Sequence, residues 1–284
     1  MNPPIVLLTD FGSHDPFVGI MKGVITEINP ATPLIDLSHE IPPGDIQRTA
    51  ITLWQSAPYF PKGSIFLTVV DPGVGTQRHA IILESGPFKF VGPDNGAFTF
   101  ISDDDTKAWK LSNPAFALSN PGMTFHGRDI FAPAAAHASR GISSPELGEP
   151  IPNLVRIAEP QLKSTPDGIL HGEILHADHF GNTLTSLGQF LKLENGNWQL
   201  QPWVGHTPSL EINLNETHLQ LPNGDYLPWA KTFGEIPAGQ CAAIIGSNGL
   251  IEIAANGQSA AKLLGCTGGE ALRLFMDSKH PVWF

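Results

Sequence analysis

Two acidic side chains follow apolar, β-branched runs at points where the chain must turn. Asp71 comes directly after residues 65–70 and is followed by a proline and two glycines, with Arg78 seven residues further on. Asp10 follows a shorter apolar run, residues 5–8, and precedes a glycine. Open α/β sheets bind ligands at the carboxyl ends of their strands, so both acids could line one crevice. The alternatives are a structural ion pair between Asp71 and Arg78, and helix capping by Asp10.

A histidine adds a candidate proton acceptor. His126 lies in a loop just before an alanine-rich helical run that ends at Gly141. An imidazole has an unperturbed pKa of about 6.5, so it can take up a proton near neutral pH. The arginines Arg78 and Arg128 and several acids could lie near it in the fold, which favours a catalytic role. The alternative is that His126 is a surface residue without a catalytic role.

The composition is typical of a globular chain. Of its 284 residues, 41% are hydrophobic and 15% charged, and the net charge of −11 comes with no basic cluster, which argues against nucleic acid. The apolar runs are too short to span a bilayer, and the first residues lack the basic segment of a signal peptide. Cys241 and Cys266 form neither a disulfide framework nor a metal-binding spacing. We therefore expect a soluble, cytoplasmic protein without a membrane or nucleic-acid partner.

The first half of the chain alternates apolar strands with amphipathic helices. Apolar residues recur at helical spacing over residues 16–29, and Asp45 can cap a second helix. The order strand, helix, strand, helix, strand is typical of parallel sheets. We predict an α/β N-terminal domain with a mostly parallel sheet between helices. Its predicted strands are residues 5–8, 34–37 and 65–70, followed by a hairpin of residues 80–83 and 88–91.

The second half of the chain has a different pattern, with a proline-rich segment followed by short strands. Residues 143–166 contain five prolines, and we predict an interdomain linker there, with domains at residues 1–155 and 156–284. Several short strands follow at regular spacing, and Gly246-Ser247-Asn248-Gly249 is a turn signal for a hairpin. We predict a smaller, all-β, barrel-like C-terminal domain with one short helix over residues 259–264.

A metal site is a further interpretation of the second half. His176 and Asp178 lie two residues apart on a predicted strand and would share a face, whereas His179 would point away. Three convergent ligands are therefore not indicated, and we expect no metal.

Five segments in order resemble one known family. They are Thr9-Asp10-Phe11-Gly12, residues 69–78, residues 92–96, residues 126–133 and residues 178–182. In this order the chain closely resembles the S-adenosyl-L-methionine hydrolases that form adenosine, also called SAM hydroxide adenosyltransferases, which are relatives of the fluorinase and chlorinase. The resemblance covers nearly the whole chain. It implies an α/β domain, a β-barrel domain, and a homotrimer whose ligand lies between the N-terminal domain of one subunit and the C-terminal domain of the next.

The resemblance also implies roles for single residues. Asp71, Arg78 and His126 match the residues that handle the attacking water, and Asp10 matches the residue that holds the ribose hydroxyls. S-adenosyl-L-methionine is then the substrate, adenosine and L-methionine are the products, and no cofactor is needed. The other residues that we expect to bind the substrate are Phe11, Asn95, Asp178, Phe180, Asn182, Ser247, Glu252 and Asn256.

A halogenase is the nearest alternative. Such an enzyme needs a dry halide pocket lined by a hydroxyl and backbone N–H groups. Gly127, Asp71 and Gly44 stand where the fluorinase pattern has a serine, a tyrosine and a tryptophan, and an anionic Asp71 would repel a halide. The sequence therefore favours water as the nucleophile.

Two further functions remain open. A non-catalytic nucleoside-binding protein would use Asp10, Phe180 and Asn182 for binding alone, and turnover of S-adenosyl-L-methionine would exclude it. A metal-dependent hydrolase would use Asp10, Asp71 and His126, and insensitivity to chelators would exclude that.

Overall fold

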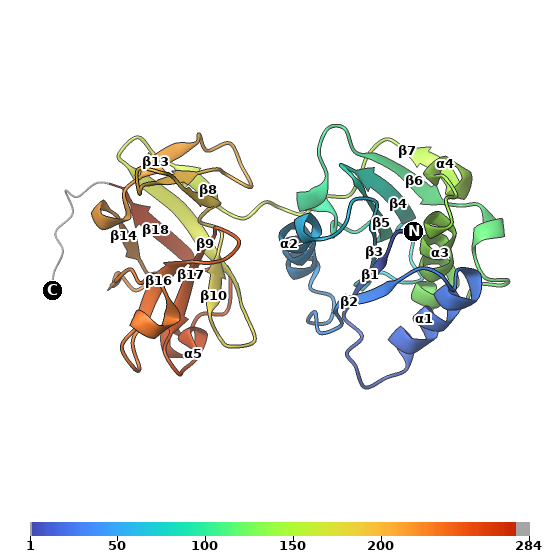
Figure 1. Ribbon diagram of the computed structural model, residues 1–284, viewed down its shortest axis with the longest axis horizontal. Helices are drawn as coiled ribbons and strands as arrows, with labels where there is room; N and C mark the ends of the chain where they lie inside the picture. The colour runs from blue at the N-terminus through green and yellow to red at the C-terminus, as the bar shows by residue number, and fades with distance from the viewer. Residues whose placement is uncertain (1, 277–284) are drawn as a thin grey trace. The chain divides into compact units, whose positions relative to one another are not determined.

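The computed structural model describes residues 2–276, and the chain folds into two compact units (Figure 1). The first unit ends at Ile157 and the second begins at Ala158. The boundary predicted from the sequence lies after residue 155. Within residues 2–276, no helix is both long and apolar enough to cross a membrane.

A seven-stranded mixed sheet organises the first unit, in the order β2-β1-β3-β5-β4-β6-β7. The first four strands in this order are parallel, whereas β4, β6 and β7 join by antiparallel pairing. The prediction of a mostly parallel sheet is correct for these four strands only. The predicted hairpin is β4–β5, whose strands are joined by Gly86 and Pro87, too few residues for the long crossover that parallel strands need. The sequence did not predict β6 and β7, which extend the antiparallel part of the sheet. The strands are β1 (Ile5–Thr9), β2 (Leu34–Ser38), β3 (Ile65–Val69), β4 (Ala80–Ser85), β5 (Phe88–Pro93), β6 (Lys107–Leu111) and β7 (Gly148–Ile151).

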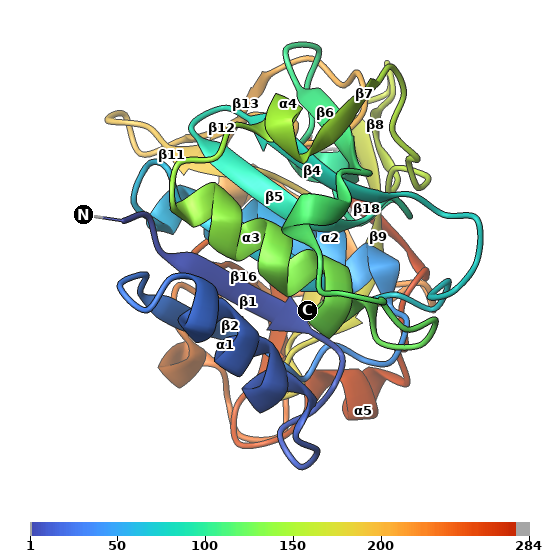
Figure 2. The same ribbon diagram turned by 90° about the vertical axis from the view of Figure 1, so that its right-hand side faces the viewer.

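Helices cover both faces of this sheet, with α1 and α3 on one face and α2 on the other (Figures 1 and 2). Successive side chains of a strand point to opposite faces. Ile5 and Leu7 of β1 accordingly join the apolar core under α1 and α3, whereas Val6 and Leu8 join the core that contains Leu53 of α2. The helical segments of this unit are α1 (Phe17–Ile28), α2 (Ile46–Ser56), η1 (Ala57–Tyr59), η2 (Thr99–Ile101), η3 (Pro114–Phe116), the π-helix η4 (Gly127–Phe131), α3 (Ala132–Ser139) and α4 (Ser144–Leu147).

The start of the predicted linker belongs to the first unit. Ser143 and Glu146 form a capping box at the start of α4, and β7 then pairs with β6 at the edge of the sheet. The prolines of this segment predicted a linker without regular secondary structure. Pro145 lies in the first turn of α4, where a helix tolerates proline, and Pro150 lies in an edge strand, where a sheet does.

An antiparallel sheet dominates the second unit, in the order β15-β14-β18-β9-β10-β17-β16, with β8 also paired to β9. The sheet nearly closes into a barrel, because the chain just after β15 pairs with β16. The N–H of Ala243 donates to the carbonyl of Pro228 over 2.8 Å, and the N–H of Ala230 donates to the carbonyl of Ala243 over 2.9 Å. The prediction of a barrel-like, mainly β second half agrees with this sheet. Its strands are β8 (Leu162–Ser164), β9 (Ile169–Ala177), β10 (Thr183–Thr185), β14 (His218–Gln220), β15 (Tyr226–Leu227), β16 (Cys241–Ile245), β17 (Ile251–Ala255) and β18 (Ala271–Phe275).

Smaller elements complete the second unit. A separate sheet has the order β11-β12-β13, and β16 and β17 form the predicted hairpin. The predicted helix is also present: the hydroxyl of Ser259 accepts a hydrogen bond from the N–H of Lys262 at its start, and the left-handed Gly265 ends it. These elements are β11 (Phe190–Lys192), β12 (Trp198–Leu200), β13 (Leu210–Ile212), η5 (Leu214–Glu216), η6 (Phe233–Glu235) and α5 (Ala260–Leu264).

Candidate active site

Polar side chains follow four neighbouring parallel strands of the first unit. In the sheet order β2, β1, β3, β5, these side chains are His39, Asp10, Asp71 and Asn95. The last residues of β1 and β3 are paired in register, so Asp10 and Asp71 leave the sheet at the same edge. This is the placement that the sequence predicted for the two acids, and it is where open α/β sheets bind ligands.

Arg78 connects Asp71 to His126. Its Nε donates to Oδ1 of Asp71 over 3.0 Å, and its Nη2 donates to the other oxygen of the same carboxylate. Nη2 also lies 2.7 Å from Nδ1 of His126, and the guanidinium lies over the ring of Phe131. The side chains of Asp71 and Arg78 are only 4% and 10% exposed. The three residues predicted to handle water therefore form one hydrogen-bonded cluster.

The two loops that carry this cluster approach each other at Gly75. This residue has a φ of +77°, and a β-carbon there would lie 2.7 Å from the backbone oxygen of Met123. Glycine is the residue that adopts this conformation without strain and leaves room for the neighbouring backbone. The turn after β3 can therefore pack against the loop before η4, which brings Arg78 within reach of His126.

His126 is held as a neutral imidazole. Burial lowers its pKa and the nearby charge of Arg78 lowers it further, against opposing effects of Asp71, Asp129 and a backbone hydrogen bond with Gly122. Because Nδ1 accepts a hydrogen bond from Arg78, the neutral ring carries its proton on Nε2. A proton can therefore add to Nδ1 only when Arg78 releases that nitrogen.

Asp129 supports the loop that carries His126, and the sequence did not predict a role for it. Its buried carboxylate accepts hydrogen bonds from the N–H of Gly122 over 2.8 Å and from Nε and Nη2 of Arg128 over 2.5 and 3.0 Å. Burial alone would raise the pKa of Asp129, but the bonds from Arg128 and Gly122 outweigh it and lower the pKa. Asp129 thus fixes Gly122, whose backbone holds the ring of His126.

Asp10 and Phe11 lie in the loop after β1. Oδ2 of Asp10 accepts a hydrogen bond from the N–H of Gly44 over 2.8 Å. The ring of Phe11 packs against the rings of Phe17 and Phe125, with centroids 5.7 and 6.0 Å away. Phe125 directly precedes His126, so this aromatic cluster joins the loop of Asp10 to the loop of His126.

Asn95 is engaged with the backbone of its own edge of the sheet. Its Nδ2 donates to the carbonyl of Val70 over 2.9 Å, and its Oδ1 accepts from the N–H of Ala97 over 3.2 Å. These bonds hold the segment before Asp71 against the loop after β5. A role for Asn95 in substrate binding stays a prediction.

In the second unit, Asp178 organises the loop after β9. Its Oδ1 accepts from the N–H groups of Phe180 and Asn182 over 2.9 and 2.8 Å, and its Oδ2 accepts from Nδ2 of Asn182 over 2.9 Å. The side chain of Phe180 is left 77% exposed, while Asn182 is buried. This loop borders a cavity of about 610 Å³ lined by Phe180, Asn182, Phe233, Ala255, Gly257, Gln258 and Ser259.

The remaining predicted substrate residues lie on or near the hairpin β16–β17. Glu252 of β17 packs over Gly246, where a β-carbon would lie 1.9 Å from the carboxylate. Burial raises the pKa of Glu252, and the negative charge of Asp178 raises it further. Asn256 follows β17 and donates to the carbonyl of Ile236 over 2.8 Å, and Ser247 lies in the hairpin turn.

Two residues beside the predicted site were not found by sequence reasoning. Phe233 lines the same cavity as Phe180 and is 49% exposed, but no pattern sets it apart from other aromatic residues. His39 follows β2 and hydrogen-bonds to Thr9; a histidine at the end of a predicted strand was the available signal. Among the described residues 2–276, no group of three or more His, Cys, Asp or Glu side chains is arranged to hold a metal ion.

The fold and the cluster define a two-unit protein with an acid, an arginine and a histidine at the edge of a mixed sheet where its parallel strands end. Family models for the N-terminal and C-terminal domains of SAM hydroxide adenosyltransferases match residues 5–148 and 172–273. The chain belongs to this family.

Curated proteins and solved structures agree with this membership. A relative from Thermus thermophilus named (R)-S-adenosyl-L-methionine hydrolase is 39% identical over 95% of this chain and 99% of its own length. A relative of the same name from Salinispora arenicola is 37% identical over 96% and 98%. A solved structure of a conserved protein from Thermotoga maritima has a TM-score of 0.80 at 29% identity, covering 95% of this chain and 99% of its own. Proteins named fluorinase are more distant, such as one from Actinopolyspora mzabensis at 24% identity over 96% and 97%.

Proposed function

We propose that this protein hydrolyses S-adenosyl-L-methionine to adenosine and L-methionine. The observation that carries the proposal is the cluster of Asp71, Arg78 and His126 at the strand edge that also carries Asp10. The family and the names of the relatives support the same reaction.

The reaction needs an activated nucleophile, whereas its leaving group needs no general acid. Water attacks the ribose 5′ carbon, the bond from that carbon to sulfur breaks, and its electron pair stays on sulfur. Methionine therefore leaves as a neutral thioether and needs no proton. The site has to hold one water in line with the breaking bond and take a proton from it.

The cluster supplies a base and a cation for this task. His126 is neutral, and Nδ1 becomes free to accept the proton of the water when Nη2 of Arg78 turns to the developing hydroxide. Arg78 then stabilises the negative charge that forms on oxygen. Asp71 keeps the guanidinium beside His126, because its Oδ1 accepts from Nε of Arg78 while Nη2 changes partner.

Substrate contacts are proposed on both units. Asp10 holds the ribose hydroxyls, since a carboxylate accepts two hydrogen bonds. The exposed rings of Phe180 and Phe233 beside the cavity suit the flat face of a purine. The other proposed contacts, carried over from the resemblance, are Phe11, Asn95, Asp178, Asn182, Ser247, Glu252 and Asn256.

Halogenation is disfavoured at Gly127. A β-carbon at this position would lie 3.1 Å from Sδ of Met21 and 3.1 Å from the ring of Phe125. The serine of the fluorinase pattern therefore fits here only if these neighbours shift.

We further propose that no cofactor takes part, because a neutral leaving group needs no Lewis acid. Activity after dialysis against a chelator should equal the activity before it. Activity that is lost and then restored by a divalent metal would instead support a metal-dependent hydrolase.

The homotrimer implied by the resemblance is also proposed here, with each site taking Asp10 from one subunit and Asn182 from the next. Subunits carrying Asp10→Ala and subunits carrying Asn182→Ala, mixed and shown to have exchanged, should regain some activity. No recovery in such mixed oligomers would exclude a shared site.

Isotope labelling tests the reaction itself. In heavy-oxygen water, the label should appear in the 5′-hydroxyl of adenosine. Label in neither product, or a 5′-chloro nucleoside formed in chloride buffer, would overturn the proposal. Binding of S-adenosyl-L-methionine without turnover would favour the non-catalytic alternative.

A further inference from the structure

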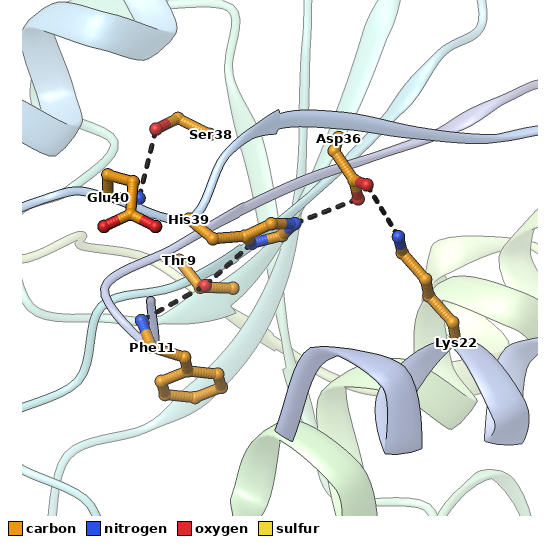
Figure 3. A network of polar contacts seen from close by, with 7 residues as sticks. All are labelled: Thr9, Phe11, Lys22, Asp36, Ser38, His39 and Glu40. Carbon is orange, nitrogen blue, oxygen red and sulfur yellow. Dashed lines mark hydrogen bonds and ion pairs between the residues drawn. The ribbon is translucent and has the colours of Figure 1, made fainter. Parts of the chain in front are cut away.

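A chain of hydrogen bonds runs from helix α1 to the loop that carries Asp10 (Figure 3). Nζ of Lys22 pairs with Oδ2 of Asp36 over 2.6 Å, and Oδ1 of Asp36 lies 2.9 Å from Nε2 of His39. Nδ1 of His39 lies 2.9 Å from the hydroxyl of Thr9, which accepts a hydrogen bond from the N–H of Phe11 over 3.3 Å. This chain of hydrogen bonds therefore links α1, β2 and the end of β1.

Donors and acceptors alternate along this chain without conflict. The carboxylate of Asp36 can only accept, so Nε2 of His39 donates to it, and in this tautomer of the ring Nδ1 is the acceptor. The hydroxyl of Thr9 then donates to Nδ1 and keeps an oxygen lone pair for Phe11. This order satisfies every member, and the hydrogen bond and charge of Lys22 favour the ionised Asp36 that it requires.

The two residues at the end of the chain flank Asp10. Thr9 is fully buried and is fixed through its hydroxyl, and Phe11 is fixed through its backbone N–H. The carbonyl of His39 also accepts from the N–H of Gly12 over 2.8 Å. His39 thus restrains the loop on both sides of Asp10, whose own Oδ2 is held by Gly44.

We propose that His39 is a positioning residue, which holds the carboxylate of Asp10 in the orientation that binds the ribose hydroxyls. This inference rests on the proposed function, in which Asp10 contacts the ribose. Without the ring nitrogens of His39, Thr9 loses its acceptor and Asp36 loses a donor. The loop of Asp10 then keeps its backbone bonds and the packing of Phe11 on Phe17 and Phe125, but the hydroxyl of Thr9 is no longer held, and the ribose contact weakens.

The test compares two ligands that differ only at the ribose. Calorimetry would measure the affinity of the intact protein for adenosine and for 2′,3′-dideoxyadenosine. Hydrogen bonds to a charged group contribute about 1.5–3 kcal/mol each, so adenosine should bind about 10-fold or more tightly than the dideoxy compound. In Asp10→Ala this preference should disappear.

Variants in the chain then separate positioning from general support. His39→Phe keeps a ring without its nitrogens, and Thr9→Val keeps the shape of threonine without its hydroxyl. Both should lower adenosine affinity about 10-fold and leave affinity for the dideoxy compound unchanged. Thr9→Ser retains the hydroxyl and should keep the preference. Ser38→Ala is a matched control, because the Ser38 hydroxyl accepts from the N–H of Glu40 outside the chain from Lys22 to Phe11.

Each outcome decides the matter. If His39→Phe and Thr9→Val keep the native preference, or weaken both ligands equally, His39 does not position Asp10. If His39→Phe fails to fold, judged by its melting curve, Thr9→Val and Thr9→Ser decide the question by the same ratio. If the native protein binds both ligands equally, or Asp10→Ala keeps the preference, the ribose role of Asp10 fails first. That result also removes the basis of the proposal for His39.

Discussion

Nη2 of Arg78 lies 2.7 Å from Nδ1 of His126, on the nitrogen that a catalytic base would have to keep open. The same guanidinium binds both oxygens of Asp71. Arg78 is therefore the centre of the cluster, and it links the imidazole of His126 to the carboxylate of Asp71. The proposed role of His126 as the base therefore requires Arg78 to release Nδ1 during the reaction.

Replacement of His126 should separate a base from a space-filling residue. We expect His126→Asn to lower kcat by about 10²–10⁴-fold, the usual effect of removing a general base, with little change in KM. Steady-state kinetics with S-adenosyl-L-methionine would measure both. His137→Asn is the control, because this histidine of α3 packs on Phe116 and also has a pKa lowered by burial and Arg140. Near-native kcat in His126→Asn would leave Asp71 as the base.

The pH dependence follows from the same residue. Burial and Arg78 lower the pKa of His126, so its neutral, active form persists below the ordinary value of about 6.5. We expect kcat to stay level as the pH falls through 6.5 and to decline only at lower pH, and this acid limb should be absent in His126→Asn. A decline already centred above pH 6.5 would contradict the lowered pKa.

The stability of the fold should also fall at low pH, as kcat does. The unfolded chain takes up a proton on His126 at a higher pH than the folded chain does, so the free energy of unfolding should fall as the pH drops from about 6.5 towards the lowered pKa. Denaturant melts should show a shallower fall for His126→Asn. Some fall should remain, because the pKa of His137 is lowered as well.

Substitutions of Arg78 test the role of its planar fork. Lysine keeps the charge but cannot bind both oxygens of Asp71 and reach His126 at once. We expect kcat to fall in Arg78→Lys and to fall further in Arg78→Ala. The acid limb of kcat should also move to higher pH in Arg78→Ala, because the nearby positive charge is gone. An Arg78→Lys variant with native kcat would show that charge alone is sufficient.

Gly75 can be tested with a matched glycine. Both Gly75 and Gly86 have positive φ, but a β-carbon at Gly75 would meet the backbone of Met123, whereas at Gly86 nothing lies within 4 Å. Alanine at either position should destabilise the fold by about 1–2 kcal/mol through its backbone conformation. Only Gly75→Ala should also lower kcat, because it pushes Arg78 away from His126. Equal kinetics in the two variants would argue against this contact as the determinant.

Local patterns predicted the parts of this molecule that depend on neighbours in sequence. The apolar runs before Asp10 and Asp71 are strands, Asp45 caps α2 through the N–H of Arg48, and Arg78 folds back on Asp71. The spacing from Asp71 to Arg78 is short enough for the chain between them to decide the contact.

Contacts between segments that are distant in the sequence could not be predicted from local patterns. Arg78 and His126 are 48 positions apart, and their contact depends on the approach of Gly75 to Met123, which no periodicity reports. The strands β6 and β7 were missed because lysines interrupt the apolar residues of β6 and a proline lies within β7. The hydrogen bonds of His39 were not predicted, because its partners Thr9 and Asp36 lie on two different strands.

The pairing of β16 with the segment just after β15, which nearly closes the second sheet, has a consequence for self-association. A free strand edge is a template on which another chain can add a strand. At the outer edge of β16, Pro228 and Ala230 of the same chain already use the N–H and carbonyl of Ala243. That edge is therefore protected from fibril-like growth, and a second copy that meets this unit there must be recognised by its side chains.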